Sequence, residues 1–160
     1  APVLRLLAGR LGKAPAELRI YDPFYCAGGT VRHLTALGFP LVYNRCEDFY
    51  SVAAAGRIPP HDVLVTNPPY SGDHVERLLR FLAGPNVTKP FCLLVPDYFV
   101  WRSNYPSAIG GRHPVFLRPR APQQYFYWTP PGMRVKANDA KKSHRNLALG
   151  TRTSPFVSSW

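Results

Sequence analysis

Apolar residues fall into two patterns along the first hundred positions: short continuous runs and positions with helical spacing. The runs are rich in β-branched and aromatic residues and are bounded by turn residues, which predicts strands. The predicted strands are 18–23, 40–44, 61–66 and 90–96. The helix-spaced positions lie before and between them, and they predict helices at 2–12, 30–38, 49–56 and 73–83. This alternation predicts an α/β fold with a mostly parallel sheet.

The helix predicted over 73–83 carries a start signal and a regular apolar face. Ser71 or Asp73 can cap its first turn, and Glu76 and Arg80 have the spacing of an i,i+4 ion pair. The apolar positions expected to face the sheet are Val75, Leu78, Leu79 and Leu82. The pattern therefore predicts a helix that packs on the strands by one face.

The last third of the chain predicts a different arrangement. Residues 115–117 and 123–128 have the composition of strands, and 154–160 is expected to form a final strand in an antiparallel pair. Segment 129–152 lies between them and is rich in Gly, Pro and Lys. A loop of that length in a single domain is usually functional or disordered, so we expect this segment to contact the target.

The strand predicted over 61–66 ends in Asn67-Pro68-Pro69-Tyr70. Because proline cannot donate a ladder hydrogen bond, the strand must stop there. The tetrad then lies at the carboxyl end of a parallel strand, the edge where open α/β sheets bind ligands. Asn67 and the Pro68 carbonyl can together accept hydrogen bonds from one exocyclic NH2 group, while Tyr70 can stack on a base. The alternative is an ordinary proline turn with a buried tyrosine.

Polar and glycine residues also follow the first two predicted strands. The first ends in Asp22-Pro23-Phe24 and leads through the tight turn 25–30, which contains Gly28, into a helix. Strand, glycine turn and helix is a layout that brings backbone close to a nucleotide-like ligand. Asn44 and Asp48 come at and just after the end of the second strand. Amide or carboxylate oxygens there can accept hydrogen bonds from ribose hydroxyls or an adenine amine.

Together these residues resemble the class I S-adenosylmethionine-dependent methyltransferases, and within them the amino-methyltransferases that carry Asn-Pro-Pro-Tyr. The resemblance covers roughly residues 18–100. It implies a shortened Rossmann-like sheet, S-adenosylmethionine as cofactor, and methyl transfer to an exocyclic amine, with N6 of adenine in RNA favoured and ribosomal RNA included. The implied catalytic residues are Asn67, Pro68, Pro69 and Tyr70. The implied cofactor-binding residues are Asp22, Phe24, Tyr25, Cys26, Gly28, Asn44, Asp48 and Asn67.

The chain also departs from the family pattern. Cys26 stands where the family usually has glycine, Tyr25 beside it is bulky, and the connection 44–48 is very short. These departures favour an alternative, a catalytically inactive methyltransferase-like protein that binds RNA or assists ribosome assembly. A DNA adenine methyltransferase and a protein glutamine methyltransferase are further alternatives, since both targets present an NH2 group.

Length and charge indicate one domain of 160 residues with a polyanionic partner. The net charge is +11, and it is uneven: residues 1–97 carry ten Lys/Arg and eight Asp/Glu, whereas residues 98–160 carry ten and one. Basic residues interleaved with the aromatic run 125–128 suit RNA, with DNA or a ribonucleoprotein partner left open. The residues expected to contact nucleic acid are Lys136, Lys141, Lys142, His144 and Arg145. The alternative is core aromatics beside a solvated charged face.

The three cysteines, Cys26, Cys46 and Cys92, are scattered and form no Cys-x-x-Cys pair. An odd, scattered set argues against a disulfide framework and against a zinc site, and we expect a reducing, intracellular compartment. No run of 18 apolar residues occurs, so the sequence predicts no membrane-spanning helix.

Overall fold

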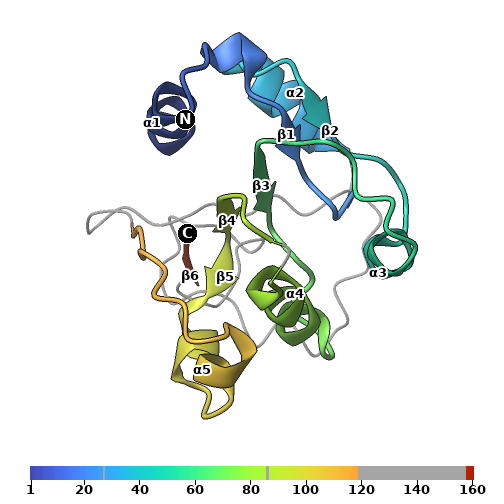
Figure 1. Ribbon diagram of the computed structural model, residues 1–160, viewed down its shortest axis with the longest axis vertical. Coiled ribbons are helices and arrows are strands. Elements are labelled where there is room, and N and C mark those ends of the chain that lie inside the picture. The colour runs from blue at the N-terminus through green and yellow to red at the C-terminus, as the bar shows by residue number, and fades with distance from the viewer. Residues whose placement is uncertain (27, 86, 119–157) are drawn as a thin grey trace, which may run out of the picture.

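The computed structural model describes residues 1–26, 28–85, 87–118 and 158–160. Its centre is a parallel sheet with the strand order β2-β1-β3-β4 (Figure 1). Its strands are β1 (Ile20–Tyr21), β2 (Val42–Tyr43), β3 (Val63–Thr66) and β4 (Phe91–Leu93). Each neighbouring pair runs parallel. The predicted α/β class with a parallel sheet is therefore confirmed, and the arrangement is compatible with a Rossmann-like fold.

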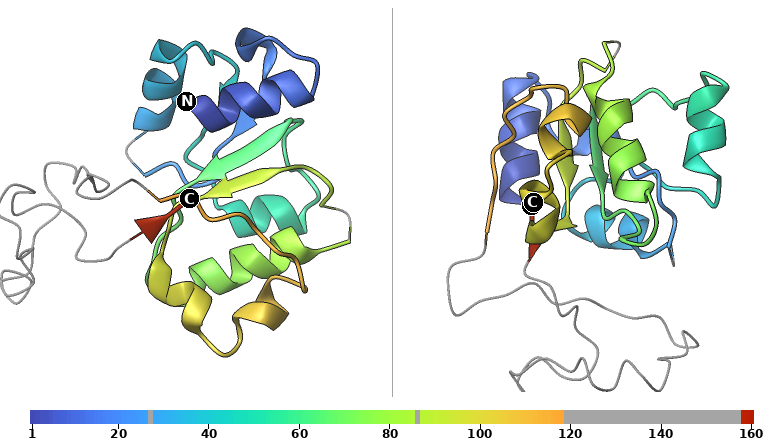
Figure 2. Two further views of the ribbon diagram at one scale, coloured as in Figure 1. Left: turned by 90° about the vertical axis from the view of Figure 1, so that its left-hand side faces the viewer. Right: turned by 90° about the horizontal axis from the view of Figure 1, so that it is seen from below.

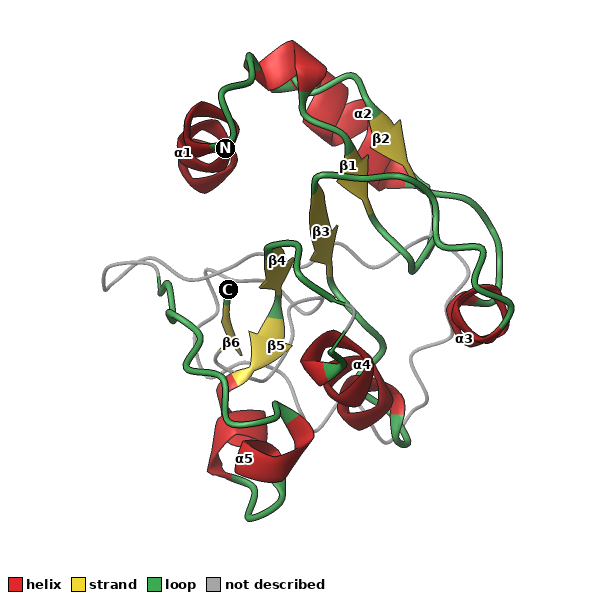
Figure 3. Ribbon diagram, viewed as in Figure 1, coloured by secondary structure: helices red, strands yellow, loops and turns green. Residues whose placement is uncertain are grey.

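Helices lie on both faces of this sheet (Figures 2 and 3). The α-helices are α1 (Pro2–Arg10), α2 (Gly29–Ala36), α3 (Phe49–Ala54), α4 (His74–Ala83) and α5 (Tyr105–Ala108). Two short 3-10 helices, η1 (Pro15–Glu17) and η2 (Asp97–Trp101), were not expected from the sequence. One apolar cluster contains Leu4 and Ala8 of α1, and a second contains the buried face of α4.

The continuous apolar run of β3 contributes side chains to both apolar clusters. All four of its residues are buried. Val63 and Val65 belong to the α1 cluster, whereas Leu64 belongs to the α4 cluster. Because side chains alternate across a strand, a strand covered on both faces needs apolar residues at every position.

The side chain of Asp62 fastens the start of β3 to the chain before β1. It accepts hydrogen bonds from Lys13 Nζ at 2.7 Å, from the Arg19 backbone N–H at 2.9 Å and from the Arg19 guanidinium at 3.0 Å. These contacts hold the pKa of the Asp62 carboxyl well below its usual range. The carboxylate therefore helps to set the register of β1 against β3.

The expectations for α4 are confirmed in detail. Its four predicted core residues are all buried, and the Glu76–Arg80 ion pair forms at 2.6 Å. Asp73 is the N-cap residue, but its side chain makes no capping hydrogen bond. It lies instead 4.0 Å from the Arg77 guanidinium.

The predicted strand 90–96 is divided between two sheets. Its first part is β4, while β5 (Val95–Pro96) pairs antiparallel with β6 (Ser158–Ser159). Leu117 and Trp160 exchange two backbone hydrogen bonds, at 2.9 and 3.1 Å. The final strand is therefore in an antiparallel pair, as predicted, but its partner is β5, and of the strand predicted over 115–117 only Leu117 is paired. The predictions for 123–128 and 129–152 lie outside the described residues.

Candidate functional site

Asn67 stands directly after β3 at the carboxyl edge of the sheet, and it is exposed. Because β3 ends at Thr66, the predicted stop of the strand before the two prolines is confirmed, and Pro68 is buried. The Tyr70 hydroxyl donates a hydrogen bond to Asn67 Oδ1 and lies 3.2 Å from the Leu94 carbonyl oxygen. The tetrad is thereby held against the junction of β4 and β5, and the acceptor atom of Asn67 is engaged by Tyr70.

Asp22 joins the ends of two neighbouring strands to the turn before α2. It is only 5% exposed, and it accepts hydrogen bonds from Thr66 Oγ1 at 2.6 Å, Thr30 Oγ1 at 2.7 Å and the Phe24 N–H at 3.3 Å. Burial raises the pKa of the Asp22 carboxyl, and the three hydrogen bonds oppose that rise. Asp22 thus links the end of β1 to the end of β3 and to the first turn of α2 by hydrogen bonds.

Asn44 lies buried at the end of β2 with one free acceptor. Its side-chain N–H group donates to the Asp22 carbonyl at 3.1 Å and to the Phe24 carbonyl at 3.4 Å. Its Oδ1 atom is buried and has no hydrogen-bond partner among the described residues. Since buried polar atoms are nearly always paired, this oxygen is the atom of the site most in need of a donor.

Asp48 acts as the N-cap of α3. One oxygen of its carboxylate accepts hydrogen bonds from the Ser51 backbone N–H at 3.0 Å and from Ser51 Oγ at 2.5 Å. Both bonds lower the pKa of the Asp48 carboxyl. The position that the resemblance implied for a cofactor contact therefore has a local role in starting a helix.

In the described part of the turn after β1, Cys26 with φ of 52° and Gly28 with φ of 70° are in the left-handed region. A Cβ at Gly28 would lie 2.6 Å from the Tyr25 hydroxyl oxygen and 2.7 Å from Tyr25 Cζ. The Tyr25 ring, 39% exposed, therefore lies directly against this glycine. The space beside Gly28 that the resemblance assigns to the cofactor is taken by a side chain of the same turn.

An aromatic cluster that the sequence analysis missed surrounds Phe24. The Phe24 ring lies 5.6 Å from that of Phe49, 6.2 Å from Tyr50 and 6.4 Å from His74. The Tyr50 hydroxyl donates to the His74 carbonyl at 2.8 Å, and the Arg77 guanidinium lies 3.6 Å from the Tyr50 ring centroid. The only signal in the sequence was the Phe-Tyr pair at the start of α3, which indicates burial but not a partner.

The structure thus brings together part of the predicted site. Asp22, Phe24 and Asn44 are linked by hydrogen bonds, and Thr66, the residue directly before Asn67, joins this network by its bond to Asp22. The residues predicted to contact nucleic acid, Lys136, Lys141, Lys142, His144 and Arg145, lie outside the described residues.

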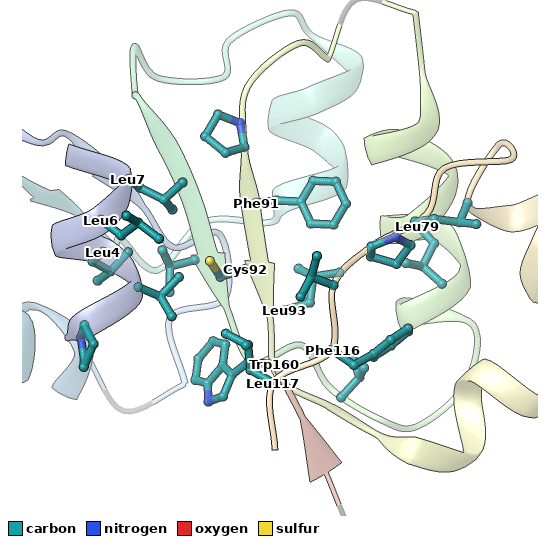
Figure 4. Close-up of a pocket in the computed structure, with 18 of the residues that line it drawn as sticks. Leu4, Leu6, Leu7, Leu79, Phe91, Cys92, Leu93, Phe116, Leu117 and Trp160 are labelled. Atoms are coloured by element: carbon teal, nitrogen blue, oxygen red, sulfur yellow. The ribbon is translucent and has the colours of Figure 1, made fainter. Parts of the chain in front are cut away.

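A large apolar cavity lies along β4, lined by residues of α1 on one side and of α4 on the other (Figure 4). Its volume is about 910 Å³, and its lining includes Leu4, Cys92, Phe116 and Trp160. None of the residues implied for catalysis or cofactor binding lines it.

The described part of the chain offers neither a metal-binding cluster nor a membrane-spanning helix. There, no cluster of three or more His, Cys, Asp or Glu side chains could hold a metal ion. Nor does any helix in that part have the length and apolar character needed to cross a membrane. Comparisons with protein-family models, curated proteins and solved structures found no match.

Proposed function

We propose that this protein is an S-adenosylmethionine-dependent methyltransferase that acts on an exocyclic amine, with N6 of adenine in RNA as its target. The observation that carries the proposal is the position of Asn67, exposed directly after β3 and beside the strand β1. Ligands of open α/β sheets bind outside the carboxyl ends of the strands, so an amide side chain at this point can orient a bound amine.

The residues of the tetrad have separate tasks in this proposal. Asn67 Oδ1 and the Pro68 carbonyl accept the two hydrogens of the amine, which directs the nitrogen lone pair. Target binding replaces the hydrogen bond that Tyr70 now makes to Asn67. The Tyr70 ring stacks on the base, which contributes about 1–3 kcal/mol. The amine needs no strong base before it reacts, so orientation provides much of the rate gain.

Two observations bear on the fit of the cofactor. The unpartnered Oδ1 atom of Asn44 suits a hydroxyl or amine donor of an adenosine. The Tyr25 ring lies against Gly28, but it is partly exposed and can rotate into solvent to uncover the turn. When bound, the cofactor supplies an electrophilic methyl group on a sulfonium. The chain's own part is to hold the adenosine at Asn44 and the amine at Asn67.

The proposal is tested by incubating the full chain with RNA, or with DNA, and isotope-labelled cofactor, followed by mass spectrometry of the nucleosides. We expect labelled N6-methyladenosine in the RNA pool only. Asn67→Ala should abolish the label, whereas Tyr70→Phe should retain it because the ring remains. Undiminished labelling with Asn67→Ala, or no label in RNA, would contradict the proposal.

A catalytically inactive RNA-binding scaffold is the second candidate, and the contact between Tyr25 and Gly28 favours it. Cys26 adds to this, because a side chain in the left-handed region is strained at a turn that the family builds from glycine. Calorimetric titration with S-adenosylmethionine separates the candidates. No heat at high cofactor concentration supports the scaffold, and binding that appears only with Tyr25→Ala identifies the ring as the block.

A further inference from the structure

Trp101 is the most exposed aromatic residue among those that the structure describes, and it follows the carboxyl end of β5 along the chain. It ends η2, which follows β5, and its side chain is 80% exposed. Tryptophan is on average well buried in folded proteins, and an exposed ring offers a flat face on which a base can stack. The Tyr70 hydroxyl lies 3.2 Å from the Leu94 carbonyl oxygen, which connects the tetrad to the strand that leads into η2.

Arg102 follows Trp101 directly, and its guanidinium is held in place by aromatic rings. It lies 4.4 Å from the Phe99 ring centroid and 5.4 Å from that of Tyr98. A guanidinium stacked on a ring keeps its N–H donors free at the edge, and these match a phosphate. Among the described residues no carboxylate forms an ion pair with Arg102.

Other arginines nearby are in a different position. Arg77 stacks on Tyr50, but Asp73 lies 4.0 Å from it. Arg80 is paired with Glu76 at 2.6 Å. An ion pair with a carboxylate reduces the attraction of an arginine for a phosphate. Glu76 lines the same small hollow as Arg102, but its ion pair is with Arg80, so Arg102 is the better anion contact. An exposed ring beside an unpaired guanidinium is the combination that single-stranded nucleic acid requires.

We propose that single-stranded RNA crosses the carboxyl edge of the sheet, with Trp101 stacked on a base near the target adenine and Arg102 bound to an adjoining phosphate. The proposal deepens the proposed function, on which the adenine target rests, but the strand contact itself requires no methyl transfer. The net charge of +11, most of it carried by residues 98–160, favours a polyanion over an apolar protein as the partner of this chain.

The test is the fluorescence anisotropy of a labelled twelve-nucleotide RNA titrated with the full chain, without cofactor, over a range of salt concentrations. Trp101→Ala should weaken binding about 5- to 150-fold, the range that base stacking supplies. Val115→Ala is the matched control, since Val115 is also 80% exposed, and it should leave the affinity unchanged. Equal affinities of these two variants would overturn the stacking contact.

The salt dependence tests the phosphate contact separately. Arg102→Ala should lower the slope of log affinity against log salt by about 0.7, the value for one phosphate on a single strand. Arg80→Ala, an exposed arginine with its own carboxylate, should leave the slope unchanged. Equal slopes for the two variants would overturn the assignment of Arg102. Thermal melting confirms that all four variants are folded.

Two comparisons separate this inference from the proposed function. Single-stranded DNA of the same sequence should bind more weakly than RNA, and equal or tighter binding would overturn the assignment to RNA. Methyl transfer is measured on the same RNA in parallel. If Trp101→Ala weakens binding while no transfer occurs, only the enzymatic proposal fails. If transfer occurs and Trp101→Ala binds like the wild type, only the strand contact fails.

Discussion

The hydrogen bond from Thr66 to Asp22 offers a direct test of what holds the site edge together. Thr66 Oγ1 donates to Asp22 Oδ1 at 2.6 Å, and the two residues are 2% and 5% exposed. Thr66→Val keeps the branched shape and removes the donor. A hydrogen bond to a charged group contributes about 1.5–3 kcal/mol, so the free energy of unfolding should fall by that amount. Domains of this kind have about 5–15 kcal/mol in total, so the loss is measurable.

Urea unfolding followed by circular dichroism measures this loss. With a denaturant dependence of about 2 kcal/mol per molar urea, the midpoint should fall by about 1 M. Thr35→Val is the control, because Thr35 is exposed in α2, and its midpoint should stay close to that of the wild type. If the two variants unfold at the same urea concentration, Thr66 does not support the buried carboxylate and our reading of this network is wrong.

The loss of stability in Thr66→Val should also depend on pH. Burial raises the pKa of Asp22, so the stability associated with this group is greatest when it is protonated and is lost as the pH rises through its folded pKa. Thr66→Val removes a bond that favours the carboxylate, which raises that pKa further. The deficit of the variant should therefore shrink as the pH falls toward the unfolded value of about 3.9. A deficit that stays constant with pH would contradict this account.

Three further predictions concern the turn, the start of β3 and the core. Gly28→Ala should lower the free energy of unfolding by about 1–2 kcal/mol, because alanine is strained at a φ of 70°. The additional substitution Tyr25→Ala should recover only the part of this loss that comes from contact with the Tyr25 ring. Unchanged thermal melting of Gly28→Ala would count against the turn geometry. Asp62→Asn should destabilise the chain at neutral pH by loss of the charged bonds to Arg19. Because these bonds lower the folded pKa of the carboxyl, the difference from the wild type should begin to shrink below about pH 4, the unfolded pKa, and vanish only below the folded pKa. A pH-independent difference in urea midpoint would refute this. Leu78→Ala removes a side chain that is fully buried in α4, so it should lower the free energy of unfolding by about 2–5 kcal/mol, the usual range for a buried leucine. A loss under about 1 kcal/mol would argue against the α4 core.

The fold was accessible from the sequence wherever the signal was local. The core face of α4 follows from the spacing of its four leucine and valine positions, and all four are buried. The continuous apolar run of β3 indicates a strand covered on both faces, which the structure shows. The prediction failed over 90–96, because the division between β4 and β5 depends on which strand pairs with which, and β5 pairs with residues some sixty positions further along the chain.

The candidate site was predictable only in its location. Proline stops a strand by its covalent structure, so the placement of Asn67 at a strand end follows from the sequence. The partners of the site residues could not be predicted in the same way. Asp48, predicted to contact the cofactor, caps α3, and Phe24 packs in an aromatic cluster with residues from α3 and α4.

The sequence by itself therefore determined the alternation of strands and helices, the face by which α4 packs, and the strand end that carries the amide. These depend on periodicity and on the backbone chemistry of proline, which act over a few residues. The tertiary structure alone decided that Asp22 is bound by Thr66, 44 positions away, and that Asn44 keeps an unpartnered buried oxygen. Such contacts depend on strand register and loop path, because a hydrogen bond forms only when two distant segments are brought within about 3 Å of each other.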